Sequence, residues 1–227
     1  MELKRFEVDG GTLAVEVAGS GPLVICAAGM GDTRDSYSEV ANQLVAKGYC
    51  VASMDTRGHG DSSAKFNRYG DEATADDFLM IVEKLNLGPA VLAGCSFAAA
   101  AAVIAAGRRP EAVAGIVLLG PFLRNGMGGV IGLWILPLFF LRPYGPWMWQ
   151  TYAATLWPGL GDKAKERAKS SRTSLTRPDR WSAFQAVVSS LDHRQAAPWI
   201  DQVQAPVLVL MVSTRELFPS GYHGCYS

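Results

Sequence analysis

Five short apolar runs, each as long as a typical β-strand, recur along the chain and are separated by segments with helical patterning. They cover residues 22–28, 49–54, 90–93, 113–119 and 206–211. Strands that are apolar on both faces are typical of a parallel sheet covered by helices on both sides. Before them, Lys4–Val8 and Leu13–Val17 alternate around Gly10-Gly11, which predicts a hairpin. The pattern predicts an α/β fold with a mainly parallel, doubly wound sheet.

Helix starts are expected at two places between these strands. Ser36 and Glu39 have the spacing of a capping box, in which the serine hydroxyl and the glutamate satisfy free backbone N–H groups. Thr74 and Asp77 have the same spacing. The first of these helices is expected to end at Gly48, because glycine accepts the left-handed conformation that often closes a helix.

Residues 121–204 depart from the regular alternation and mix Trp, Pro and Gly with helix-like pieces. The tryptophans of this segment include Trp134, Trp147, Trp149, Trp157 and Trp181. We expect a helical cap insertion over the carboxyl edge of the sheet. The chain is then divided into the first part of the core at 1–120, the cap at 121–204, and the last core strand with a short tail at 205–227.

A serine lies between a predicted strand and a predicted helix. Ser96 is flanked two positions away by Gly94 and Ala98, and small residues are needed there in the sharp turn called a nucleophile elbow. Cys95 fits this role less well, because Phe97 would then occupy a position that needs a small residue. Ser96 would also fit as an ordinary N-cap of the following Ala-rich helix, and this alternative stays open.

A second motif follows the strand before the elbow. The run Asp55-Thr56-Arg57-Gly58-His59-Gly60-Asp61-Ser62 resembles the D-x-R-G-x-G-x-S loop of many α/β-hydrolases, and with the elbow it makes the chain similar to that superfamily, on its serine esterase and lipase side. The resemblance implies that Asp55, Arg57 and His59 shape the turn and an internal ion pair. It does not imply that His59 is a catalytic base.

A third motif occupies the place of the family's oxyanion loop. Ala28 stands where the family usually has His, followed by Gly29, Met30 and Gly31. The resemblance implies that the backbone N–H groups of Met30 and Phe97 hold the oxyanion, with Gly29 allowing the turn. An ordinary Gly-rich turn is the alternative. A phosphate loop is disfavoured, because no Lys-Ser/Thr pair follows the glycines.

The family's order is Ser, then an acid, then His after the last strand. Glu216 is the carboxylate available as the acid, and His223 would be the base that activates Ser96. Too few residues follow Met211 for the family's remaining elements. We therefore expect a fold that lacks its C-terminal part, with the strand at 206–211 as an apolar edge prone to self-association.

Two functions remain open. The first is a serine hydrolase that acts on a carboxylic ester or similar acyl bond of a small apolar substrate, under a Trp-rich roof. The second is a catalytically impaired or inactive protein that at most binds a small apolar molecule. An aspartate in place of Ser96 would have indicated dehalogenase or epoxide hydrolase chemistry.

Composition limits the partners. The 21 Lys and Arg residues balance 21 Asp and Glu residues, so no overall charge favours nucleic acid. Membrane contact is not expected, because residues 130–141 are too short to span a bilayer; residues 131–140 are better explained as a buried cap core than as a membrane-contacting surface.

The cysteines indicate the compartment. They have no paired spacing and mostly lie in or beside apolar runs, so free thiols and a cytoplasmic location are expected, without a signal peptide. No cofactor or metal site is expected, and His193 with Asp192 is interpreted as a solvated pair.

Overall fold

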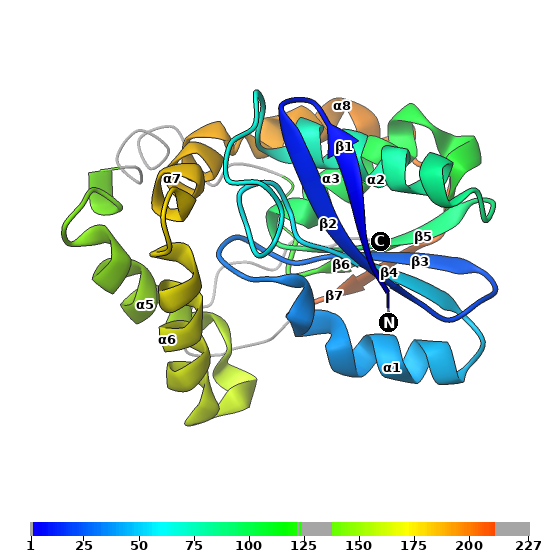
Figure 1. The fold of residues 1–227 in the computed structure, drawn as a ribbon. Helices are drawn as coiled ribbons and strands as arrows, with labels where there is room; N and C mark the ends of the chain where they lie inside the picture. Colours follow the sequence, from blue (N-terminus) through cyan, green and yellow to red (C-terminus); the bar gives the residue numbers. More distant parts are fainter. Residues whose placement is uncertain (1, 122, 124–137, 212–227) are drawn as a thin grey trace, which may run out of the picture.

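The computed structural model describes residues 2–121, 123 and 138–211, with a seven-stranded sheet at its centre (Figure 1). The strands are β1 (Glu2–Val8), β2 (Gly11–Ala18), β3 (Leu23–Ala27), β4 (Cys50–Met54), β5 (Ala90–Cys95), β6 (Val113–Leu119) and β7 (Val207–Leu210). Their order is β1-β2-β4-β3-β5-β6-β7. The pairs that involve β1 and β2 are antiparallel and all others are parallel. The predicted fold class is confirmed.

Helices cover both faces of the sheet. Helix α1 (Ser38–Ala46) lies on one face, and α2 (Asp71–Leu85) and α3 (Phe97–Arg108) lie on the other (Figure 1). Successive residues of β3 point to opposite faces, so Val24 and Cys26 pack with α1 while Ile25 packs on the side of α2 and α3. Ala98 to Ala106 of α3 are buried throughout, and these small side chains allow the helix to lie close to the sheet.

Both helix starts predicted from capping boxes were wrong. Ser36 lies in the 3-10 turn η1 (Arg34–Tyr37), where its hydroxyl donates to the Thr33 carbonyl at 2.7 Å, and α1 begins only at Ser38. Thr74 lies inside α2, which begins at Asp71 directly after Gly70. A Ser or Thr three residues before an acid is compatible with these positions as well, so the local pattern does not fix the first residue of a helix.

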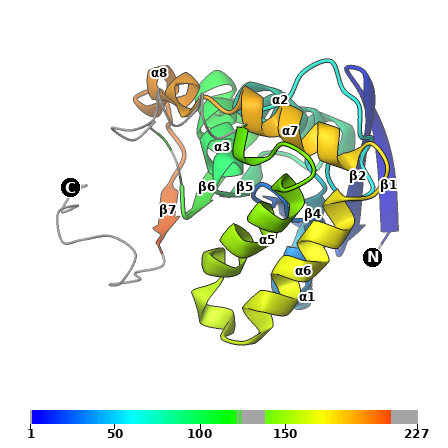
Figure 2. The same ribbon diagram turned by 90° about the vertical axis from the view of Figure 1, so that its left-hand side faces the viewer.

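Three helices form a layer beside the carboxyl ends of the parallel strands (Figures 1 and 2). They are α5 (Gly145–Leu156), α6 (Lys163–Leu175) and α7 (Arg180–Ser190), with the 3-10 turn η3 (Pro158–Leu160) between the first two. We call residues 138–190 the cap. It has its own apolar core, in which Phe140, Trp149, Trp181 and Phe184 pack ring against ring.

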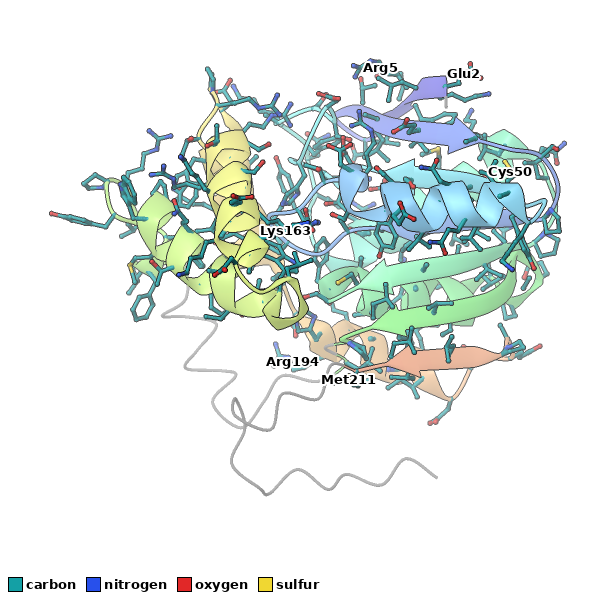
Figure 3. All side chains as sticks on the ribbon, turned by 90° about the horizontal axis from the view of Figure 1, so that it is seen from below. Glu2, Arg5, Cys50, Lys163, Arg194 and Met211 are labelled. Carbon is teal, nitrogen blue, oxygen red and sulfur yellow. The ribbon has the colours of Figure 1, made fainter. Side chains whose placement is uncertain are left out.

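The chain returns to the sheet through η4 (His193–Ala196) and α8 (Ala197–Ile200), which pack against α3. Trp199 lies so close to α3 that a Cβ atom on Gly107 would come within 2.8 Å of it. Strand β7 follows and forms an edge of the sheet, and Figure 3 shows Met211 at its end. Among the described residues, no helix combines the length and apolar character needed to cross a membrane.

Candidate active site

Ser96 stands in a strained turn between β5 and α3. Its backbone has φ +58° and ψ −119°, a conformation that residues other than glycine rarely adopt. The Ser96 N–H donates to the Leu119 carbonyl of β6 at 2.9 Å, which ties the turn to the neighbouring strand. The side chain makes no capping hydrogen bond to α3, unlike that of an ordinary N-cap serine.

The small residues around Ser96 are required by contact. A Cβ atom on Gly94 would lie 2.2 Å from the Ala98 carbonyl oxygen, so no other residue fits position 94 without a shift of the backbone. Ala98 is fully buried beneath the turn. Gly94, Ser96 and Ala98 therefore have the spacing and the geometry of a nucleophile elbow.

The loop after β3 runs directly beside this serine. A Cβ atom on Gly29 would lie 3.2 Å from Ser96 Cβ. Among the hydrogen bonds of the described residues, none uses the backbone N–H of Met30 or of Phe97 as donor to a backbone or side-chain oxygen. An oxyanion hole requires two such donors that converge on the position of the developing oxyanion.

The surroundings of these donors are apolar. The side chains of Met30 and Phe97 pack in one cluster with Tyr69, with Val187 of α7 and with Leu191, the residue directly after α7. Phe97 is 2 % exposed. Aliphatic side chains from α7 and the residue after it thus pack against Phe97, which directly follows Ser96.

The sequence predicts a Trp-rich roof over the substrate site, and the described tryptophans contribute less to the apolar cluster around Phe97 than this prediction implies. Trp149 and Trp181 are buried in the cap's own core, and Trp147 is exposed at the surface. Trp157 is partly buried beneath the guanidinium of Arg167, and Trp134 lies outside the described residues. The described side chains that cluster with Phe97 are instead Val187 of α7 and Leu191 directly after it, which no sequence motif marks.

The loop after β4 has the structural role that the resemblance implies, but with different partners for its two charges. Asp55 is fully buried and pairs with Arg34, whose backbone N–H also donates to it at 2.8 Å. Arg57 forms a two-point ion pair with Asp77 at 2.7 and 2.9 Å. Asp55 and Arg57 each belong to an internal ion pair, and neither pairs with the other.

The cysteines of the described residues, Cys26, Cys50 and Cys95, are free thiols. Burial raises the pKa of Cys95, and that of Cys26 rises to about 12 for the same reason. A thiol with a raised pKa is mostly protonated near neutral pH and is a weak nucleophile. The raised pKa disfavours Cys95 as a nucleophile.

The two histidines that the structure describes are both engaged. His59 is 1 % exposed and bonded on both ring nitrogens. His193 was predicted to be solvated, which is wrong: its Nδ1 lies 2.8 Å from a carboxylate oxygen of Asp71, which is fully buried. Burial raises the pKa of Asp71. The predicted acid Glu216 and base His223 lie outside the described residues.

Two clefts in the described part of the chain are not lined by Ser96. One of about 780 Å³ lies between the start of β4 and the end of α2, near Glu2 and Cys50 in Figure 3, and one of about 510 Å³ lies on the outer side of the cap at Leu138 and Tyr144. Neither is lined by a serine or a histidine. Within the described residues, no group of His, Cys, Asp or Glu side chains is arranged to hold a metal ion.

Several sequence relatives are named as hydrolases. An uncharacterized hydrolase, YraK, of Bacillus subtilis (strain 168) is 32% identical over 126 residues, which are 55% of this chain and 46% of that protein. An epoxide hydrolase of Caballeronia sordidicola is 30% identical over 133 residues, 56% of this chain and 40% of that protein. The chain thus matches less than half the length of these two curated relatives.

Solved structures share the fold. An esterase from Thermogutta terrifontis has a TM-score of 0.75 at 20% identity, with 92% of this chain and 79% of that chain covered. The enol-lactonase of Burkholderia xenovorans LB400 has a TM-score of 0.73 at 20% identity, with 91% and 80% covered. The family model described as alpha/beta hydrolase fold matches residues 22–226. The chain belongs to the α/β-hydrolase fold family.

Proposed function

We propose that this protein is a serine hydrolase that cleaves a carboxylic ester or a similar acyl bond through Ser96. The observation that carries the proposal is the strained turn at Ser96, with φ +58°, beside the backbone N–H groups of Met30 and Phe97, which donate to no other group in the hydrogen bonds of the described residues. Strain of this kind is retained where it exposes a reacting group.

The reaction begins with attack of Ser96 Oγ on the acyl carbon. His223 accepts the hydroxyl proton as the new C–O bond forms, and Glu216 stabilises the resulting imidazolium. The carbonyl oxygen becomes an oxyanion that accepts hydrogen bonds from Met30 N–H and Phe97 N–H. His223 then gives its proton to the leaving alkoxide, and water releases the acid from Ser96 by the same steps.

The substrate is a small apolar acyl compound. Met30, Phe97, Val187 and Leu191 offer aliphatic and aromatic surface next to the elbow, where an acyl chain loses its contact with water. The structural neighbours include proteins named as an esterase and an enol-lactonase, whose names indicate ester bonds. A serine at the elbow favours acyl chemistry over the epoxide opening named for one sequence relative.

A second candidate is a protein of this fold that binds a small apolar molecule without cleaving it. The observation in its favour is that His59 and His193 are both bonded to other groups and are not available as the base that activates Ser96. Catalysis would then depend on His223. The free thiols Cys26 and Cys50 support a cytoplasmic location for either function. Cofactors and nucleic acid partners form no part of the proposal.

Hydrolysis of p-nitrophenyl acetate by the purified protein tests the first function. The wild type is expected to release p-nitrophenol catalytically, and Ser96→Ala and His223→Ala are expected to lower kcat by about three orders of magnitude or more. Ser170→Ala, an exposed serine of α6, is the matched control and is expected to retain full activity. Equal rates for the wild type and Ser96→Ala would exclude Ser96 as the nucleophile.

A further inference from the structure

We infer that His59 and Ser171 are positioning residues that hold the oxyanion loop from its two sides, His59 from the core and Ser171 from the cap. The catalytic consequence rests on the proposed function. Both residues act on Gly31, which directly follows the expected oxyanion donor Met30. Neither touches the Ser96 side chain in any hydrogen bond of the described residues.

The hydrogen bonds of the His59 ring show which of its two nitrogens carries the proton. The Gly31 N–H donates to His59 Nε2 at 2.9 Å, so Nε2 carries no proton. On the other side of the ring, Nδ1 lies 3.1 Å from the Arg57 carbonyl oxygen and 3.1 Å from Thr56 Oγ1. Because a carbonyl only accepts, Nδ1 carries the proton, and His59 is the neutral Nδ1–H tautomer.

The surroundings of His59 favour this neutral form. The ring is 1 % exposed and faces the edge of Phe184 from α7, and burial lowers the pKa of His59. The carboxylates of Asp55 and Asp32 oppose this shift, and the guanidinium of Arg180 adds to it. A protonated ring would turn an N–H toward the Gly31 N–H, and the hydrogen bond to the loop would be lost.

The cap binds the other side of the same residue. Ser171 Oγ donates to the Gly31 carbonyl and accepts a hydrogen bond from Trp149 Nε1 at 2.9 Å. Arg167, one turn earlier on α6, binds Asp32 Oδ2 at 2.7 Å and Ser36 Oγ at 2.6 Å. The cap therefore binds the loop through two residues of α6, and Trp149 of α5 holds one of them, Ser171, in place.

Together these contacts fix three consecutive peptide groups. The Gly29 carbonyl accepts from Asp32 N–H at 3.2 Å, and this carbonyl belongs to the same peptide plane as the Met30 N–H. The next plane is fixed by His59 through the Gly31 N–H, and the plane after that by Ser171 through the Gly31 carbonyl. Since N–H and C=O of one peptide point in opposite directions, Met30 N–H is held pointing away from the turn.

A donor that is oriented before the reaction stabilises the oxyanion without reorganising in the transition state. Loosening the loop should therefore lower kcat and leave KM nearly unchanged, since KM depends on the apolar contacts. Ser171→Ala removes one hydroxyl and is expected to lower kcat for p-nitrophenyl acetate about 10-fold. Ser171→Thr keeps a hydroxyl and should restore most of the loss, and the adjacent exposed Ser170→Ala should have no effect.

A readout independent of activity tests the His59 contact. In the ¹⁵N NMR spectrum of the folded protein with labelled histidine, His59 should show a protonated Nδ1 and an unprotonated Nε2, and should stay neutral as the pH falls through about 6.5. A protonated Nε2, or titration near that ordinary value, would overturn the inference. An unchanged kcat in Ser171→Ala would overturn the role of Ser171.

The two hypotheses fail in different ways. A wild-type protein that leaves p-nitrophenyl acetate intact would remove the proposed function and the catalytic role of His59 and Ser171, whatever the spectrum shows. An active wild type whose His59 is the Nε2–H tautomer would leave the hydrolase in place and remove the positioning role of His59.

Discussion

Trp149 of the cap packs directly on the backbone of Gly31 in the loop beside the elbow. A Cβ atom on Gly31 would lie 2.0 Å from Trp149 Cζ2, and Gly31 has φ +76°. The cap and the face of the core that carries Ser96 therefore meet at a position that only glycine can occupy. Through Ser171, the same tryptophan is also linked to the Gly31 carbonyl by hydrogen bonds.

Gly31→Ala is expected to lower the free energy of unfolding by roughly 2–6 kcal/mol, because the cost of a positive φ at alanine and the cost of the overlap with Trp149 add up. Urea unfolding followed by tryptophan fluorescence measures this. Gly48→Ala is the matched control: Gly48 has φ +86° but no atom within 4 Å of a Cβ, so only the backbone cost of about 1–2 kcal/mol remains. Equal losses in both variants would argue against tight packing of the cap on the loop.

Gly94→Ala tests the elbow itself. The new Cβ would overlap the Ala98 carbonyl oxygen, so the turn at Ser96 must open, with a loss of stability of about 2–3 kcal/mol. Gly115→Ala in β6 is the control, because its Cβ would meet ordinary contacts at 3.6 Å or more. The midpoint of urea unfolding should be lower for Gly94→Ala than for Gly115→Ala. Coincident midpoints of the two variants would contradict the described elbow.

Acid should weaken the fold through His59. Its pKa in the unfolded chain is about 6.5 and burial lowers it in the folded chain, so the unfolded chain binds more protons between these two values. The contribution of His59 to stability is then fully present above pH 6.5 and decreases as the pH falls toward the folded-state pKa. In urea unfolding at pH 7.5 and 5.5, the difference between the wild type and His59→Gln should shrink at the lower pH, and a constant difference would contradict this.

Self-association is expected through β7. Its residues Val207, Leu208, Val209 and Leu210 are each about half exposed, at 50 %, 52 %, 51 % and 49 %, and β7 forms the edge of the described sheet. An apolar edge strand with free backbone groups pairs readily with another chain. Light scattering after size exclusion should show dimers or larger species that Val209→Lys dissociates. The control Val40→Lys, at an exposed site of α1, should leave them intact, and a monomeric wild type would exclude this association.

The sequence predicts the strands well, because continuous apolar runs such as Leu23–Ala27 and Cys50–Met54 are bounded by polar or Gly-containing turns. It fails at the starts of α1 and α2, where Ser36 and Thr74 satisfy a motif that the backbone does not use. At Ser36 a local hydrogen bond to the Thr33 carbonyl competes with the capping box, and at Thr74 the helix has already begun at Asp71.

The contacts of the candidate site are less accessible to prediction. The roles of Gly94 and Ala98 can be predicted from the sequence, because the turn at Ser96 allows only small residues at these two positions. The bond from Gly31 to His59 joins positions 28 residues apart, and that from Ser171 to Gly31 joins positions 140 apart. No local pattern encodes such pairs: the first arises where two loops of the core meet, and the second where the cap packs on the core.

Covalent labelling with a fluorophosphonate probe, mapped by peptide mass spectrometry, tests the central role of Ser96 most directly. The probe reacts with serines that an adjacent base activates. The predicted result is labelling of the folded wild type at Ser96, absent in Ser96→Ala and strongly reduced in His223→Ala. A folded protein that remains unlabelled at Ser96 would contradict the account and leave the non-catalytic binding function as the one supported.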